Sequence, residues 1–160
     1  LRKSQTYALA VREFNFSYTD DPFCATPPVR FPPYGISFSL VAGGPGDLRN
    51  NKAYIMFGDA NCSDIYTVTL ADGSNEQVEV FNVANEIEIQ ALAGYGTPCP
   101  AGCSLTDANV AYQRPAPSVI LSGNGVSFPN LDRIEITLHI PNESLSAKII
   151  VRTTGQVSIE

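Results

Sequence analysis

The chain has 160 residues, of which 44% are hydrophobic and 16% are charged, and its net charge at pH 7 is −6. This length suits one domain with a core of its own, and we treat residues 1–160 as a single domain. The negative charge, without a basic stripe that alternates with aromatic residues, excludes nucleic acid as an expected partner.

The first stretch, residues 1–14, predicts a helix. Residues that share one helical face recur at spacings of three and four; they are Ser4, Tyr7, Ala8, Val11 and Phe14. No N-cap residue precedes Leu1, and an isolated helix of this length is marginal in water. We therefore expect the lower part of a longer helix, with an ordinary first helix behind a trimmed leading tag as the alternative.

The chain beyond residue 14 predicts loops and short strands. Residues 15–33 are rich in Pro and form a loop. Alternating or compact apolar runs between turn residues predict ten strands, at residues 34–41, 53–57, 65–70, 77–81, 86–92, 110–113, 118–121, 133–140, 147–153 and 156–160. The last three should form an antiparallel meander, whereas residues 94–107 are expected to be a loop.

These elements predict an α+β fold. The N-terminal helix should pack against two antiparallel sheets formed by residues 34–160. The alternating pattern of most strands fits sheets that have one solvated face.

The four cysteines are Cys24, Cys62, Cys99 and Cys103, and their spacing lacks the paired Cys-x-x-Cys units of a zinc site. The short Pro- and Gly-containing segment between Cys99 and Cys103 predicts a disulfide, which leaves Cys24 to pair with Cys62. Four cysteines allow three pairings, so spacing alone does not fix the connectivity. Disulfides favour an extracytoplasmic protein, and free buried thiols are the alternative.

No catalytic constellation is present in the sequence. His139 is the only histidine, and its alternation with Leu138 and Ile140 predicts a solvated strand residue rather than a general base or ligand. No P-loop, nucleophile elbow or dinucleotide fingerprint occurs. Solvated strand faces explain the regularly spaced glutamates better than a glycosidase pair does; these are Glu79, Glu86, Glu88 and Glu135. We expect no enzymatic activity and no organic cofactor.

One acidic turn has the residue types of a weak calcium site. Asp59, Asn61 and Asp64 place oxygen side chains at spacings that wrap a hard cation. The glycine of a complete EF-hand loop is missing. A turn held by Asx side chains explains the same residues and is the favoured interpretation.

The order of features resembles a known family. Four segments carry the resemblance: residues 2–12, 31–38, 54–61 and 148–158. Together they resemble type IV pilins and type II secretion pseudopilins, in particular the GspH/FimT-like minor branch. Residues 15–30 and 94–107 match poorly, and the family's leader, early glutamate and long apolar helix are not in this sequence. No cysteine follows Cys103, unlike in many major pilins.

The resemblance implies a structural subunit of an extracytoplasmic filament. Its partners would be other pilin subunits, and the only membrane contact would run through the missing apolar helix, which anchors such subunits in the inner membrane before assembly. The alternative is a free secreted β-sandwich that binds a glycan or another surface ligand, with Tyr18, Tyr95 and Tyr112 available to stack on sugars.

Overall fold

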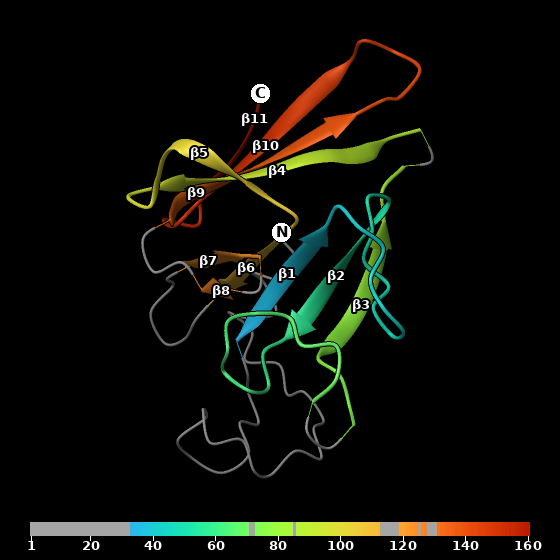
Figure 1. Cartoon of the computed structure of the whole chain (residues 1–160), viewed down its shortest axis with the longest axis vertical. Helices are drawn as coiled ribbons and strands as arrows, with labels where there is room; N and C mark the ends of the chain where they lie inside the picture. Colours follow the sequence, from blue (N-terminus) through green and yellow to red (C-terminus); the bar gives the residue numbers. More distant parts are fainter. Residues whose placement is uncertain (1–32, 71–72, 85, 113–118, 125, 128–130) are drawn as a thin grey trace.

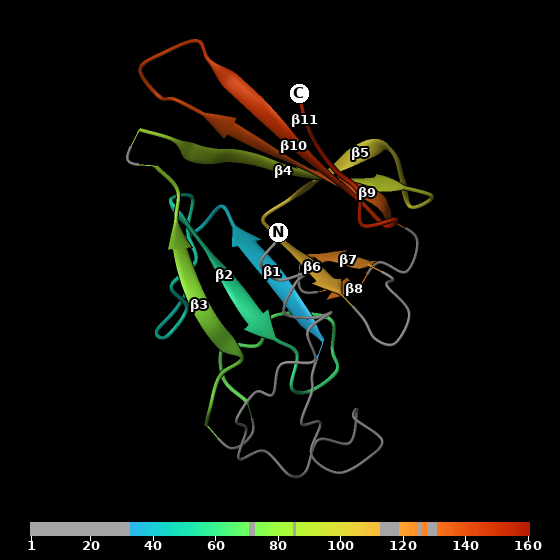
Figure 2. The same cartoon turned by 180° about the vertical axis from the view of Figure 1, so that it is seen from behind.

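The computed structural model describes residues 33–70, 73–84, 86–112, 119–124, 126–127 and 131–160. They form two antiparallel sheets that lie as separate layers, with sheet B above sheet A in Figures 1 and 2. The strands of sheet A, in spatial order, are β3 (Gln77–Asn82), β2 (Ala53–Gly58), β1 (Tyr34–Ser39), β6 (Asp107–Tyr112), β7 (Val119–Gly123) and β8 (Val126–Ser127). Those of sheet B are β11 (Val157–Ile159), β10 (Ser146–Arg152), β9 (Leu131–His139), β4 (Glu88–Gly96) and β5 (Cys99–Leu105).

The predicted α+β fold class is wrong, because the described residues are all-β and contain no helix. The helix expected at residues 1–14 lies outside the described residues. The two sheets pack on each other, because each turns an apolar face inward and these faces fill the space between them. The expectation failed because it assumed that a helix covers the apolar faces of the sheets, whereas the two sheets cover each other.

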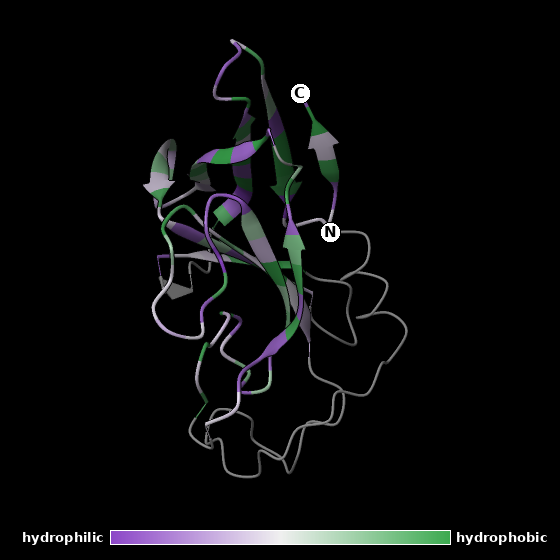
Figure 3. Cartoon of the chain, turned by 90° about the vertical axis from the view of Figure 1, so that its right-hand side faces the viewer, coloured by the Kyte–Doolittle hydropathy of each residue, from purple (hydrophilic) through white to green (hydrophobic). Residues whose placement is uncertain are grey.

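The core shows why the strands alternate. In β9, Ile134 and Ile136 are buried against sheet A, while Arg133 and Glu135 point outward. In β1, Ile36 points inward between strands that also supply apolar residues. Figure 3 shows this alternation of hydrophobic and hydrophilic residues along the strands. The main cluster draws on both sheets; it includes Tyr34, Ile36, Phe38, Leu92, Leu105, Val110, Leu121, Leu131, Ile134, Ile136 and Val151.

The C-terminal meander is present as predicted. Strand β10 pairs with β9 on one side and with β11 on the other, both antiparallel. His139 lies opposite Ser146 on β10 and Glu88 on β4, on the outer face of sheet B, where the alternation predicted it.

Residues 94–107 form a hairpin rather than the expected loop. Strand β4 continues to Gly96, and β5 pairs with it across a register shift. Gly94 lets Leu131 pack closely against β4, because glycine has no Cβ. A Cβ at this position would lie only 3.1 Å from Leu131 Cδ2. The Gly and Pro content that suggested a loop instead produces irregular strand geometry.

The disulfide between Cys99 and Cys103 lies within β5, with a Cα–Cα distance of 5.4 Å, and has the predicted pairing. Cys62 is also disulfide-bonded. Its expected partner, Cys24, lies outside the described residues, so the second pairing stays a prediction.

Candidate functional site

The outer face of sheet A carries a long connection between β2 and β3, described at residues 59–70 and 73–76, in place of the strand predicted at residues 65–70. Tyr66 is buried there and its ring lies 5.9 Å from that of Phe57. With Ile55 and Ala111 these rings form a second apolar cluster, on the side of sheet A that faces away from sheet B. The strand prediction failed because side-chain oxygens, rather than a neighbouring strand, accept backbone N–H groups of this segment. The acceptors are Ser63 Oγ for Ile65, Asn109 Oδ1 for Tyr66 and Glu76 Oε2 for Thr67.

Glu76 closes the connection from its C-terminal end. Its fully buried carboxyl group accepts hydrogen bonds from the N–H groups of Thr67 (2.7 Å), Ala60 (2.8 Å) and Asn61 (3.2 Å). Burial and the negative charge of Asp59 raise the pKa of Glu76 to about 8, although the three N–H donors act in the opposite direction. Glu76 is thus a buried titratable group in a loop. Such groups are common at functional sites, but they also occur where a side chain only stabilises the loop through hydrogen bonds.

The residues predicted to bind calcium lie at the other end of the connection. Asp59 is fully buried, and its two carboxylate oxygens accept the N–H groups of Ser63 (2.9 Å) and Asp64 (3.0 Å). Asn61 Oδ1 accepts the Ser63 N–H, and its Nδ2 donates to Thr67 Oγ1. These bonds are those of an Asx-stabilised turn.

Calcium binding at this turn stays a prediction. Within the described ranges no three His, Cys, Asp or Glu side chains are arranged to hold a metal ion. A cation at Asp59, Asn61 and Asp64 would therefore have to share oxygens that already accept backbone hydrogen bonds.

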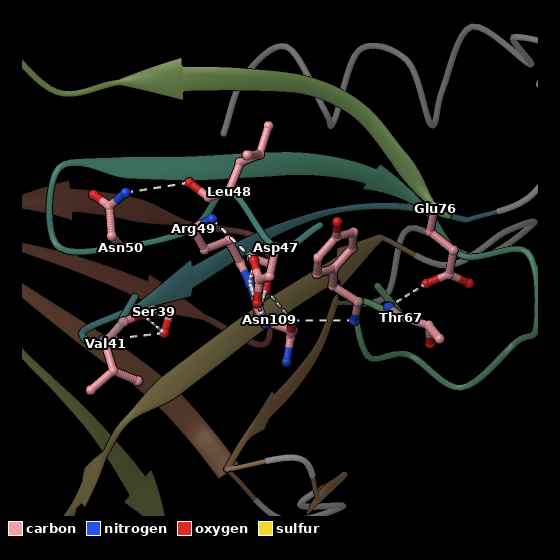
Figure 4. Close-up of polar contacts among 11 residues, drawn as sticks. Ser39, Val41, Asp47, Leu48, Arg49, Asn50, Thr67, Glu76 and Asn109 are labelled. Atoms are coloured by element: carbon pink, nitrogen blue, oxygen red, sulfur yellow. Dashed lines mark hydrogen bonds and ion pairs between the residues drawn. The ribbon is translucent and has the colours of Figure 1, made fainter. Parts of the chain in front are cut away.

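A buried polar network joins this connection to sheet A (Figure 4). Arg49 forms an ion pair with Asp47 at 2.7 Å and donates to Ser37 Oγ at 2.6 Å. Ser37 in turn donates to Asn109 Oδ1 at 2.6 Å, and the same oxygen accepts the N–H of Tyr66 at 3.3 Å. The Arg49 guanidinium also lies 4.8 Å from the centre of the Tyr66 ring. The network therefore fixes two loops on β1 and β6.

Charge and burial act against each other in this network. Burial alone would raise the pKa of the Asp47 carboxyl, but its hydrogen bonds and ion pair with Arg49 lower that pKa overall. Burial and the charge of Asp47 raise the pKa of Tyr66 to about 12. The Tyr66 hydroxyl and Asn109 Nδ2 are buried and have no hydrogen-bond partner among the described residues. The network consequently holds a neutral phenol, and it presents no activated nucleophile.

Two of the three tyrosines expected to stack on sugars are not available for that role. Tyr112 is buried, and the Arg133 guanidinium covers the Tyr95 ring at 4.0 Å from its centre. Gly102 lies so close to Tyr95 that a Cβ there would come within 2.7 Å of the ring. Tyr18 lies outside the described residues.

An apolar groove opens between the two sheets. It has a volume of about 270 Å³, and both sheets contribute to its walls; these contributions include Phe38, Tyr54, Ile89, Ile136, Leu138 and Ile149. The apolar surface continues onto β11, where Val157 is 41% exposed and Ile159 is 75% exposed. These two residues lie opposite Val151 and Ile149, so they belong to the inward-facing side of sheet B and yet remain exposed.

Three residues that organise these features were not predicted from the sequence. Glu76 follows a turn and belongs to no recognisable motif. Arg49 and Asn109 belong to a loop and a strand that carry no motif. Only their burial and their partners, which require the fold, distinguish them.

Comparisons with known proteins do not assign this chain to a family. No family model, no curated protein and no solved structure matches this chain. Within the described residues, no helix is long and apolar enough to cross a membrane.

Proposed function

We propose that this chain is the globular part of a structural subunit of an extracytoplasmic filament, either a type IV pilus-like fibre or a type II secretion pseudopilus. The ordered resemblance of its sequence to minor pilins and pseudopilins supports this function. The partners would be other subunits of the same filament, and the chain would have no catalytic role.

One observation carries the proposal. Apolar residues on the inward-facing side of sheet B stay accessible: Ile149 lines the groove, and its neighbour Ile159 on β11 is exposed together with Val157. Large apolar patches on soluble domains usually mark contacts with other polypeptides. A subunit that functions inside an assembly can leave such a surface for a neighbour. A protein that functions as a free monomer gains nothing from it.

The disulfides support the compartment of this proposal. Cys99 is bonded to Cys103 and Cys62 is also oxidised, and disulfides persist mainly outside the cytoplasm. The free glycan-binding module has less support, because Tyr95 is covered by Arg133 and Tyr112 is buried.

The test is to express the gene that encodes this chain together with a prepilin peptidase in a bacterial host, and to examine the cell surface by electron microscopy. Filaments that an antibody against this chain decorates are the expected result. A protein that is processed and secreted but stays monomeric would overturn the proposal and favour the free binding module.

A further inference from the structure

The outer face of sheet B has a basic end. Across this face, the register places Tyr95 on β4, Arg133 on β9 and Arg152 on β10 in one row. Directly opposed like charges on paired strands are unfavourable. A row with two arginines is therefore a costly arrangement for an isolated domain.

The arginines of this row differ in how they are neutralised. Arg133 forms an ion pair with Glu135 at 2.9 Å, and Lys148 forms a second ion pair with the same carboxylate, also at 2.9 Å. In the part of the chain that the structure describes, Arg152 has no ion pair. The carboxylate of Glu135 thus serves two cations, and Glu160, which is backbone-paired with Lys148, adds a second carboxylate near Lys148. Arg152 adds a further cation to this face.

The opposite end of the same sheet is acidic. Glu86 and Glu143 line a hollow of about 340 Å³ beside Pro141, at the turn between β9 and β10. Lys52 also borders the hollow, but its ammonium group lies 3.8 Å from Glu88 and donates to the carbonyl of Ile87. Both Glu86 and Glu143 are exposed, and neither forms an ion pair among the described residues.

The two ends are too far apart to neutralise each other within one molecule. Strand β9 runs from Arg133 at the basic end to His139 beside the acidic hollow, a span of about 20 Å at about 3.3 Å per residue. The screening length at physiological salt is about 8 Å. Each end therefore presents its charge to whatever molecule approaches it.

We propose that a second copy of this chain binds head to tail, with the Arg152 end of sheet B in one copy against the Glu86 and Glu143 hollow of the next. Charge complementarity identifies this occupant, because each copy carries both halves of the contact on one sheet. A head-to-tail contact uses two different surfaces, so it leaves a free end on every dimer and propagates into an open chain. The inference rests on the proposed filament and names the surfaces that neighbouring subunits share.

The contact is tested first with the purified chain by sedimentation velocity at high protein concentration. Arg152→Glu is the first variant, and Glu86→Lys with Glu143→Lys is the second. Each should weaken self-association about fivefold, which is the scale expected when one exposed ion pair becomes a repulsive pair. Thr69→Glu, which adds a negative charge at an exposed position over sheet A, is the control and should leave association unchanged.

Mixing the two variants gives the sharper result. Arg152→Glu removes the net positive charge of one end but keeps the acidic hollow, whereas Glu86→Lys with Glu143→Lys keeps the Arg152 end but makes the hollow basic. Each variant alone has therefore lost half of the contact, while the hollow of the first can still attract the Arg152 end of the second. The mixture should recover association, and 0.5 M NaCl should weaken it. Failure of the mixture to associate when the wild-type chain does associate would overturn the head-to-tail contact.

Filament assays separate this inference from the proposed function. If wild-type cells make filaments and each charge variant reduces their number while the control does not, both the function and the contact are supported. Equal numbers of filaments from the wild type and both variants would overturn the contact and leave the function standing. Absence of filaments in the wild type would overturn the proposed function itself, and sedimentation would still decide the contact.

Discussion

Replacing Glu76 by Gln tests whether a buried, protonated carboxyl group holds the connection between β2 and β3. Glu76 accepts three backbone N–H groups, from Ala60, Asn61 and Thr67. An amide that keeps its oxygen toward Ala60 and Asn61 turns its NH2 group toward the Thr67 N–H, so one of the three bonds is lost. Leaving one buried donor without an acceptor costs about 1–3 kcal/mol of unfolding free energy. Glu76→Ala removes both acceptor oxygens and with them all three hydrogen bonds, and should cost about 3 kcal/mol or more.

The pH dependence of the stability difference between the wild type and Glu76→Gln shows whether Glu76 is protonated in the folded chain. Burial and Asp59 raise the pKa of Glu76 from 4.5 to about 8, so the folded chain binds this proton more tightly than the unfolded chain does. The stabilisation from the proton is complete below pH 4.5 and is lost as the pH rises through about 8. The amide side chain does not ionise. The stability advantage of the wild type over Glu76→Gln should therefore shrink by a few kcal/mol between pH 5 and pH 9, since each pH unit by which the pKa is raised corresponds to about 1.4 kcal/mol.

Urea denaturation at pH 5, 7 and 9 measures these differences, with Glu86→Gln as the matched control because Glu86 is exposed. The control should follow the wild type at every pH. A wild-type advantage that grows with pH would refute the reasoning, because it would mean that the N–H groups stabilise an ionised carboxylate at Glu76.

The remaining predictions concern other charged groups and the cysteines. Burial alone would raise the pKa of Glu135, but its hydrogen bonds with Lys148 and Arg133 lower that pKa overall. The stabilisation that the ionised Glu135 gives is therefore present above pH 4.5 and is lost at lower pH. Glu135→Gln should lower the melting temperature at pH 6 and have little effect on it in strongly acidic buffer. If the turn of Asp59, Asn61 and Asp64 binds calcium, saturating calcium should raise the melting temperature, and identical curves in calcium and in excess chelator would show that it is only a turn. Alkylation without reduction, followed by mass spectrometry, should label none of the four cysteines, and four labelled thiols would exclude both disulfides.

The sequence predicted those parts of the fold in which alternation is regular. Strands β9, β10 and β11 were predicted as a meander because Ile134 and Ile136 alternate with charged residues without interruption. Strand β1 was predicted for the same reason. In these segments the side-chain period alone determines both the secondary structure and the buried face.

Prediction failed where side chains replaced the usual backbone pairing. Residues 65–70 alternate like a strand, yet Glu76 and Asn109 accept backbone N–H groups of this segment. No local pattern shows that a glutamate nine residues beyond Thr67 will serve as its acceptor. The candidate site was missed for the same reason, because Arg49 and Asp47 are distinguished by burial and not by spacing.

The disulfide in β5 has a consequence for how readily the protein aggregates in a concentrated solution. Strand β5 ends one side of sheet B, and an exposed strand edge is a template for the growth of aggregates. Here Pro100 lacks an N–H group to offer, and the covalent ring from Cys99 to Cys103 holds the strand in an irregular shape beside a register shift. Oxidation thus makes this edge a poor template for further strands. A reducing compartment would remove the covalent restraint, which makes the timing of oxidation relative to folding a determinant of solubility.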